Sequence, residues 1–413
     1  MEPRIELRRE PGPDLDAVGE NAALVERIRA EIRASGPMPF ARFMALALYD
    51  PDGGYYRSAE VRPGRGGDFL TAPELHPIFG ASLAVGLRDI WDRLERPEPF
   101  VIREHGAGTG ALAVSILDAL TGPNDAPFLS SVRYEPVEVD PRRIEAFEAT
   151  VSAAGHAVRI GQPNDDPFDG VVLANEVLDA LPVHRVRRRG DDLRELAVDV
   201  GPDGRLVEIE IAPTTPVLAA RLDGEGVALV DGQTAEICLT IDAWLAAATA
   251  GLRRGLVQLI DYGAPAAELY DPRRRRDGTL RAYVRHRVHD DPLVHVGRQD
   301  LTAHVDVTAV TGAATTLGLS MLGVTTQAEA LMGLGIEERL RAVQADPATT
   351  PEAYTLLRAA LLRLLDPAAM GRFRVIVLAR GWGADADRGT DAPPRILSYH
   401  LPERTRPGPT APY

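Results

Sequence analysis

The stretch Phe100-Val101-Ile102-Arg103-Glu104-His105-Gly106-Ala107-Gly108-Thr109-Gly110 joins a short apolar segment to three alternating glycines, and a helical pattern follows it from Ala111 to Leu120. This order predicts a strand, a glycine turn and a helix. Because glycine has no β-carbon, the N–H groups of such a turn can approach a bound ligand closely. The same pattern also occurs where a strand only packs against a helix, so further residues must decide between the two.

A carboxylate at the end of the next predicted strand favours a ligand site. The segment 132–138 ends at Glu138, where an acidic side chain can accept hydrogen bonds from both hydroxyls of a ribose. The glycine loop lacks the spacing of a dinucleotide fingerprint, and the chain has no lysine for a phosphate-binding loop. We therefore predict an adenosine ligand without phosphates. Its predicted binding residues are Glu104, Gly106, Gly108, Gly110 and Glu138.

Strand and helix patterns alternate along the chain. Apolar strands are predicted at 168–174, 255–260 and 373–378, and helices at 21–35, 40–49 and 78–91. Such alternation predicts a parallel sheet covered by helices on both faces. Segment 183–211 alternates charged and apolar residues between turn signals, which predicts antiparallel strands. Segment 300–317 has a helical pattern.

The chain divides into three expected regions. Residues 1–20, rich in proline and charge, are expected to form a flexible arm. Residues 21–97 form a helical and loop region. Residues 98–413 form the ligand-binding α/β domain, with insertions at about 183–250 and 264–330.

Composition narrows the partners and the compartment. The formal net charge of −14 argues against general nucleic-acid binding, because that affinity depends on basic side chains. No apolar run is long enough to span a bilayer, so no membrane partner is expected. The chain starts without a secretory pattern and has one cysteine, Cys238, so we expect a cytoplasmic protein.

Six ordered segments between residue 21 and the C-terminus resemble motifs of the MidA methyltransferase family. They are Tyr49-Asp50-Pro51-Asp52-Gly53-Gly54-Tyr55-Tyr56, Gly67-Asp68-Phe69-Leu70-Thr71-Ala72-Pro73-Glu74, Ala174-Asn175-Glu176-Val177-Leu178-Asp179-Ala180-Leu181-Pro182, Ile260-Asp261-Tyr262-Gly263, Gly278-Thr279-Leu280-Arg281-Ala282-Tyr283 and Asp300-Leu301-Thr302-Ala303-His304-Val305-Asp306. Two positions depart from the family pattern. His105 stands where a more apolar residue is expected, and Val307 stands where the family usually has phenylalanine.

The resemblance implies a Rossmann-like class I methyltransferase fold with a mostly parallel central sheet, an N-terminal helical extension and inserted β/α segments. It implies S-adenosyl-L-methionine as methyl donor and S-adenosyl-L-homocysteine as product. For mitochondrial members it implies methylation of an arginine on a subunit of respiratory complex I. The implied partner is thus a protein or peptide with an arginine. The sequence leaves the oligomeric state open, a homodimer included.

Carboxylates are expected near the acceptor, because a charged guanidinium must lose a proton as it gains a methyl group. Asn175, Glu176 and Asp179, which follow a predicted strand, are the catalytic candidates. Glu176 and Asp179 would share a helix face if the turn there were helical. The alternative is that Asn175 caps a helix and the carboxylates lie in its first turn.

Other candidates lie in loops and after the next strand. Asp68, Thr71 and Glu74 would fold over the donor as a lid, the alternative being a plain surface loop. Asp261, Tyr262, His304 and Asp306 are substrate candidates, although a histidine in an apolar helix is more often part of the core. No metal site is predicted, because the spacing of the histidines matches no familiar ligand set.

The sequence is compatible with three functions. The first is a protein arginine methyltransferase, and the second is an N- or O-methyltransferase of small molecules. The third is a catalytically silent assembly factor, against which the intact glycine loop and carboxylates argue. The run Arg273–Arg276 is typical of a solvated loop, and contact with an acidic partner is the alternative.

Overall fold

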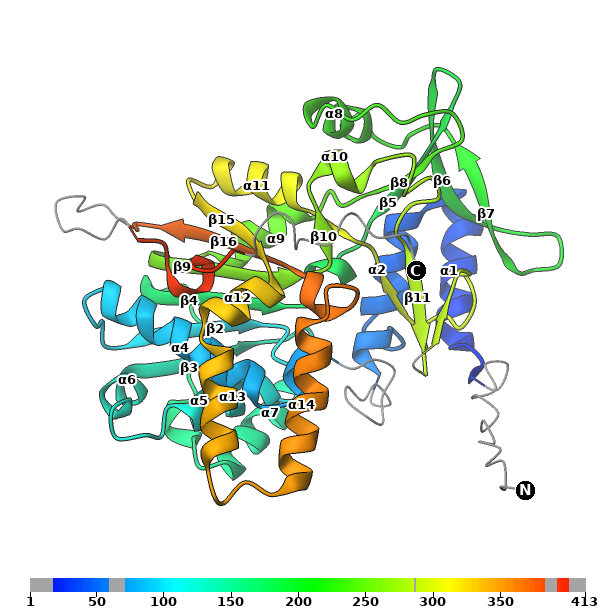
Figure 1. The fold of residues 1–413 in the computed structure, drawn as a ribbon. Helices are drawn as coiled ribbons and strands as arrows, with labels where there is room; N and C mark the ends of the chain where they lie inside the picture. Colours follow the sequence, from blue (N-terminus) through cyan, green and yellow to red (C-terminus); the bar gives the residue numbers. More distant parts are fainter. Residues whose placement is uncertain (1–17, 59–70, 286, 383–391, 401–413) are drawn as a thin grey trace, which may run out of the picture.

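A sheet of six strands forms the centre of the computed structural model, which describes residues 18–58, 71–285, 287–382 and 392–400 (Figure 1). Most of the predicted arm lies outside these ranges. The strand order is β15-β16-β9-β4-β2-β3. Strands β3, β2, β4 and β9 run parallel to one another. On the other side of β9, β16 pairs antiparallel with β9, and β15 pairs antiparallel with β16. The bounds are β2 Phe100–His105, β3 Val132–Val137, β4 Phe168–Asn175, β9 Leu252–Asp261, β15 Ser320–Thr326 and β16 Arg374–Arg380. The mostly parallel sheet predicted from the sequence is confirmed.

Helices cover both faces of this sheet (Figure 1). One apolar core lies under α4 (Ile78–Arg93), α5 (Ala111–Ala119), α7 (Pro141–Ala153), α12 (Gln327–Gly333), α13 (Ile336–Ala345) and α14 (Pro351–Leu365). A second core lies under α9 (Ile241–Ala248) and α11 (Val307–Thr316). The strands are buried along nearly their whole length, as expected of a doubly covered sheet. In the described part of the chain no helix has the length and apolarity to cross a bilayer.

The antiparallel segment predicted at 183–211 is also confirmed. It forms β5 (His184–Arg189), β6 (Asp192–Val200) and β7 (Leu206–Ile211), joined by β8 (Thr234–Ile237) and by the short β1 (Met38–Pro39). The N-terminal helices α1 (Ala22–Ser35) and α2 (Phe40–Tyr49) pack beside this sheet (Figure 1). The helical extension and the inserted strands therefore form one structure next to the central sheet.

The prediction of a helix over 300–317 is only partly right. The helix α11 begins at Val307, after β13 (Asp300–Thr302) and β14 (Val305–Asp306). Strand β13 pairs with β11 (Arg281–Val284), which also pairs with β12 (Arg287–His289). Leu301 is fully buried in the core that α1 and α2 share with β11, so tertiary packing outweighs the local helical pattern.

Candidate active site

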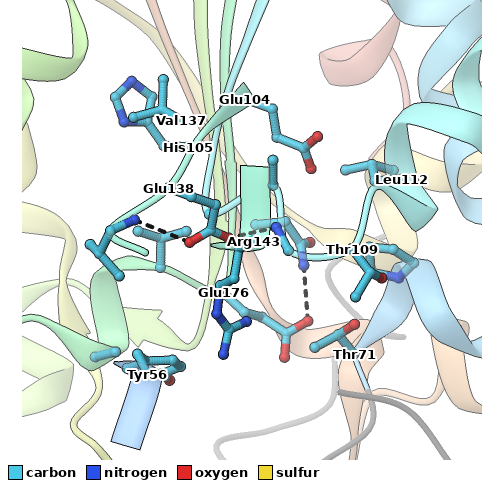
Figure 2. Close-up of a pocket in the computed structure, with 18 of the residues that line it drawn as sticks. Tyr56, Thr71, Glu104, His105, Thr109, Leu112, Val137, Glu138, Arg143 and Glu176 are labelled. Carbon is cyan, nitrogen blue, oxygen red and sulfur yellow. Dashed lines mark hydrogen bonds between the residues drawn. The ribbon is translucent and has the colours of Figure 1, made fainter. Parts of the chain in front are cut away.

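A cavity of about 380 Å³ opens at the carboxyl ends of β2, β3 and β4 (Figure 2). Open α/β sheets bind their ligands at this edge. Eight of the residues predicted from the sequence line it, namely Thr71, Glu74, Glu104, Gly106, Gly108, Glu138, Asn175 and Glu176. The sequence therefore located the two main walls of the cavity.

The glycine loop forms the floor of the cavity. Gly106 and Gly108 have φ of 70° and 55°, which glycine adopts without strain. A β-carbon at Gly106 would lie 2.7 Å from Cγ2 of Val177, whereas one at Gly108 would meet no atom within 4 Å. The backbone at Gly108 thus leaves open space for a ligand. Gly110 precedes α5 and is not part of the cavity wall.

Glu138 holds this loop to the end of β3. Its Oε1 accepts a hydrogen bond of 2.6 Å from the N–H of Gly108, and its Oε2 accepts one of 3.2 Å from the N–H of Val139. Burial raises the pKa of the Glu138 carboxyl, and the charge of Arg143 opposes the shift. The carboxylate borders the cavity beside the loop (Figure 2). It stands where the sequence predicts the ribose contact.

Glu104 lies deeper in the same wall. The hydroxyl of Tyr134 donates a hydrogen bond of 2.7 Å to its Oε2. Because the side chain is buried, the pKa of Glu104 is raised to about 8. Glu104 is therefore mostly protonated near neutral pH.

The open part of the cavity wall fits a ligand with hydroxyl groups. The backbone at Gly108 leaves space for it, and the carboxylate of Glu138 borders that space. S-adenosyl-L-methionine, which carries ribose hydroxyls, fits this arrangement. Two polar atoms in residues of the wall, Oδ1 of Asn175 and Nε2 of His105, are buried without a hydrogen-bond partner among the described residues. Buried polar atoms are rarely left unpaired, so these two are exceptions to the usual pattern.

Glu176 is held in a strained conformation where β4 ends. Its φ of 54° is left-handed, which costs a residue other than glycine about 1–2 kcal/mol. Its Oε1 accepts hydrogen bonds from Nδ2 of Asn175 at 3.0 Å and from the N–H of Ala72 at 3.4 Å. Burial, with the nearby charge of Asp261, raises the pKa of Glu176 to about 8. Strain of this kind is typical of functional sites.

The turn after Glu176 is organised by Asp261. The Oδ2 of Asp261 accepts hydrogen bonds from the N–H groups of Val177, Leu178 and Asp179, at 3.1, 2.8 and 3.3 Å. Its Oδ1 accepts one of 2.8 Å from the N–H of Tyr262. Burial raises the pKa of Asp261 to about 7, although these four donors oppose the shift. Asp261 is therefore a positioning residue, with its oxygens committed to the backbone.

Asp179 does not share a helix face with Glu176. It lies in the 3₁₀ turn η4 (Leu178–Ala180), whereas Glu176 precedes that turn in a left-handed conformation. Asp179 is buried, and this burial together with the charges of Asp261 and Asp300 raises its pKa well above the usual range. The carboxylates of Glu176, Asp179 and Asp300 thus gather in one acidic cluster.

Two tyrosines border this acidic cluster. The hydroxyl of Tyr56 donates a hydrogen bond of 2.9 Å to Oδ1 of Asp300, and that of Tyr49 donates one of 2.9 Å to the carbonyl of Ala180. The two rings stack at 5.6 Å between centroids. Both tyrosines also line the cavity, so they connect the cavity to the acidic cluster.

The predicted lid residues lie at the cavity mouth. Thr71 and Glu74 form a capping box that starts α3 (Ala72–Leu75), in which the N–H of Thr71 donates a hydrogen bond of 3.5 Å to Oε2 of Glu74. Their contacts are those of a helix cap, and both also line the cavity. Asp68 lies outside the described residues.

The remaining substrate candidates, Tyr262, His304 and Asp306, have different surroundings. The ring centroid of Tyr262 lies 4.0 Å from that of Phe373 and 6.2 Å from that of His304. His304 is not helical, in contrast to the prediction, because β14 follows it directly. Asp306 caps α11 by accepting hydrogen bonds from the N–H groups of Thr308 and Ala309, and does not line the cavity.

Several site residues were not predicted from the sequence. Tyr49 and Tyr56 belong to the first motif that resembles the MidA family, and Asp300 belongs to the last, so that resemblance offered a signal. Trp244 and Arg143 also line the cavity. Trp244 lies on α9, where its ring meets the ring of His105 at 5.5 Å, and nothing in its local sequence indicated this role.

Comparison with known proteins extends these observations. A family model described as "Putative S-adenosyl-L-methionine-dependent methyltransferase" matches residues 82–325. A Drosophila melanogaster protein named "Protein arginine methyltransferase NDUFAF7 homolog, mitochondrial" is 30% identical over 92% of this chain and 90% of its own length. The human "Protein arginine methyltransferase NDUFAF7, mitochondrial" is 26% identical over 86% of this chain and 83% of its own length.

Two solved structures are similar over nearly the whole chain. A Burkholderia thailandensis protein bound to S-adenosyl-homocysteine has a TM-score of 0.83 and 34% identity, covering 96% of this chain and 99% of that one. A native structure from the same organism has a TM-score of 0.80 and 33% identity, with the same coverage.

Proposed function

Because this chain belongs to the family of S-adenosyl-L-methionine-dependent methyltransferases, we propose that it methylates a side-chain nitrogen of an arginine in a protein substrate. Its methyl donor is S-adenosyl-L-methionine. The names of the Drosophila and human relatives support an arginine acceptor. The family assignment also replaces the alternative of a silent assembly factor with an enzyme.

The acidic cluster of Glu176, Asp179 and Asp300 carries this proposal. A guanidinium presents five N–H donors in a planar fork, and carboxylates are the acceptors that match it in charge and geometry. Asp179 and Asp300 are buried and Glu176 is half-buried, and the proximity of these carboxyls disfavours their charged forms. The guanidinium of a substrate arginine would favour the charged forms and so bind at this cluster.

Residues at the ends of β4 and β9 have different roles in the proposed methyl transfer. When bound, S-adenosyl-L-methionine supplies a methyl group already activated by its sulfonium. Glu176 has a raised pKa, and its carboxylate accepts the proton that the guanidinium must release as its nitrogen gains the methyl group. Asn175 orients Glu176 through the hydrogen bond to Oε1, and Asp261 fixes the turn that follows.

The finer identity of the acceptor is also a proposal. A subunit of a respiratory complex is our candidate, as the resemblance to the MidA family implies. A small-molecule acceptor remains the alternative. The cytoplasmic location expected from the sequence stays a prediction.

The test uses the full chain with S-adenosyl-L-methionine labelled in its methyl group and an extract of host proteins. We expect labelled protein whose acid hydrolysate contains methylarginine, and no label with Glu176→Gln. Label recovered only in small molecules, or in lysine, would contradict the proposal.

A further inference from the structure

Three arginines from distant parts of the chain converge on His304. Arg275 lies in the loop after α10 (Ala266–Leu269), Arg281 begins β11, and Arg372 ends the 3₁₀ turn η5 (Met370–Arg372). A guanidinium N–H of Arg275 approaches Nδ1 of His304 at 3.4 Å. Burial, with the charges of these three arginines, lowers the pKa of His304 to about 3. His304 is therefore neutral and faces an arginine cluster.

Two members of this cluster have no carboxylate partner in the part of the chain that the structure describes. Arg281 donates a hydrogen bond of 2.8 Å to the carbonyl of Leu280, and the side chain of Arg275 approaches His304. The charges of Glu268 and Glu236 also act on Arg275, but neither carboxylate forms a salt bridge with it. Both are half-buried. Neighbouring arginines are paired, as in Arg374 with Glu268 at 3.3 Å and Arg274 with Asp271 at 3.6 Å.

Like charges held together in a half-buried place are unfavourable. Burial and the charges of Arg372 and Arg281 lower the pKa of Arg275 from its usual value. An anion that bound among them would remove this repulsion. The chain as a whole has a formal net charge of −14, so the positive charge of this cluster is opposite in sign to the net charge of the protein.

The arginine cluster lies beside the acidic cluster, across two tyrosines. On β11, Arg281 and Tyr283 share the face opposite the buried Ala282. Tyr283 pairs with Asp300 on β13. The pKa of Tyr283 is raised by burial and by the charge of Asp179, while the charge of Arg281 opposes the shift. Tyr283 therefore faces both clusters.

Tyr262 bridges the two clusters from the other side. It follows Asp261, its ring packs against His304 and Phe373, and Phe373 follows Arg372 in the chain. Burial and the charges of Glu176 and Asp179 raise its pKa far above the usual value. The acceptor region thus has an acidic side and a basic side separated by aromatic rings.

We propose that Arg275, Arg281 and Arg372 bind the carboxylate of an aspartate or glutamate that lies close in sequence to the arginine that is methylated. This inference rests on the proposed function, because the substrate arginine occupies the acidic cluster. Arginine binds carboxylates through paired, charge-assisted hydrogen bonds. Such a contact selects acceptor arginines that have an acidic neighbour and fixes the direction of the peptide.

Within the run Arg273–Arg276, the contact is assigned to Arg275 alone. Arg273 is exposed, Arg274 pairs with Asp271, and Arg276 donates a hydrogen bond of 3.0 Å to the carbonyl of Asp231. Arg273 therefore provides a control in the same loop.

The experiment measures peptide affinity without turnover. The full chain, saturated with S-adenosyl-L-homocysteine, is titrated by calorimetry with acetyl-Gly-Glu-Gly-Arg-Gly-Glu-Gly-amide and with the same peptide carrying glutamine for both glutamates. We expect the glutamate peptide to bind about tenfold more tightly, which corresponds to about 1.4 kcal/mol. Arg275→Gln and Arg281→Gln should each reduce this ratio several-fold, and Arg273→Gln should leave it unchanged. Thermal unfolding checks that the variants fold.

Each outcome has a separate meaning. Equal affinities of the glutamate and glutamine peptides, or no binding of either, would overturn the inference. A tenfold ratio that persists in both Arg275→Gln and Arg281→Gln would also overturn it, because the preference would then arise elsewhere. A third peptide with citrulline in place of arginine tests the proposed function: if it binds as well as the arginine peptide, the arginine acceptor is contradicted while the carboxylate contact stands.

Discussion

Oδ2 of Asp261 accepts a hydrogen bond of 2.8 Å from the backbone N–H of Leu178, which lies 83 residues earlier in the chain. This bond joins the end of β9 to the turn that carries Glu176 and Asp179. The catalytic candidates that follow β4 are therefore placed by a carboxylate at the end of its neighbour β9. Parallel pairing of β4 with β9 is what brings the two together.

Asp261→Ala tests this positioning role. The variant leaves the N–H groups of Val177, Leu178 and Asp179 without their acceptor in a buried place, which should lower the free energy of unfolding by about 1–3 kcal/mol or more. Turnover should fall further than donor affinity, because the turn bearing Glu176 loses its anchor. Urea unfolding and titration with S-adenosyl-L-homocysteine measure the two effects. The exposed Asp191→Ala is the control, and an unfolding free energy equal to that of the wild type would contradict the role.

The pH dependence of turnover tests Glu176. Burial raises its pKa to about 8, so its carboxylate form becomes abundant only as pH rises toward that value. We expect kcat/KM to rise with pH through an apparent pKa near 8. We expect kcat to rise with pH through a lower apparent pKa, because a bound guanidinium favours the carboxylate. Glu176→Gln should bind S-adenosyl-L-homocysteine and lose turnover by about 100-fold or more. A rate that is independent of pH between 6 and 9 would assign proton transfer to another group.

Stability should depend on pH through Glu104. Its folded pKa of about 8 lies above the usual glutamate pKa of 4.5, so between these values the folded protein binds a proton that the unfolded chain has released. Its stabilising contribution is therefore complete below about pH 4.5 and is lost as pH rises to about 8. Glu104→Gln keeps an acceptor for Tyr134 and removes this titration, so the slope of unfolding free energy should become less negative by up to about 1.4 kcal/mol per pH unit. Urea unfolding at pH 5, 6, 7 and 8 measures the slope. Parallel curves for variant and wild type would contradict the raised pKa.

The sequence predicted the cavity wall that contains the glycine loop and Glu138 better than it predicted the contacts of the acidic cluster. Gly106, Gly108 and Glu138 follow consecutive strands, and parallel strands bring their carboxyl ends to one edge, so local patterns were sufficient. The pairing of Tyr56 with Asp300 spans 244 residues and depends on how β13 packs against the N-terminal helices. No local periodicity encodes that distance.

The same limit explains the errors in secondary structure. Together with the residues that follow, Asp300–Thr302 has a helical pattern. It is nevertheless a strand, because it pairs with β11 and because Leu301 is buried in an apolar core. The roles of Asp261 and Asp306 were also beyond the sequence. Both carboxylates end strands, but only the structure shows that one holds the turn after Glu176 and the other caps α11.

Comparing Gly108→Ala with Gly155→Ala distinguishes a methyl group that blocks ligand binding from one that only strains the backbone. Gly108 and Gly155 have φ of 55° and 87°, and a β-carbon at either would meet no atom within 4 Å. Alanine should therefore cost each site a similar conformational penalty of about 1–2 kcal/mol. Of the two, only Gly108 lines the cavity, so only Gly108→Ala places a methyl group where we expect the donor to bind. We expect its affinity for S-adenosyl-L-homocysteine to fall by more than tenfold, whereas Gly155→Ala keeps wild-type affinity. If both variants bound the ligand as the wild type does, the donor would not lie over Gly108, and the adenosine site would have to be sought along another wall of the cavity.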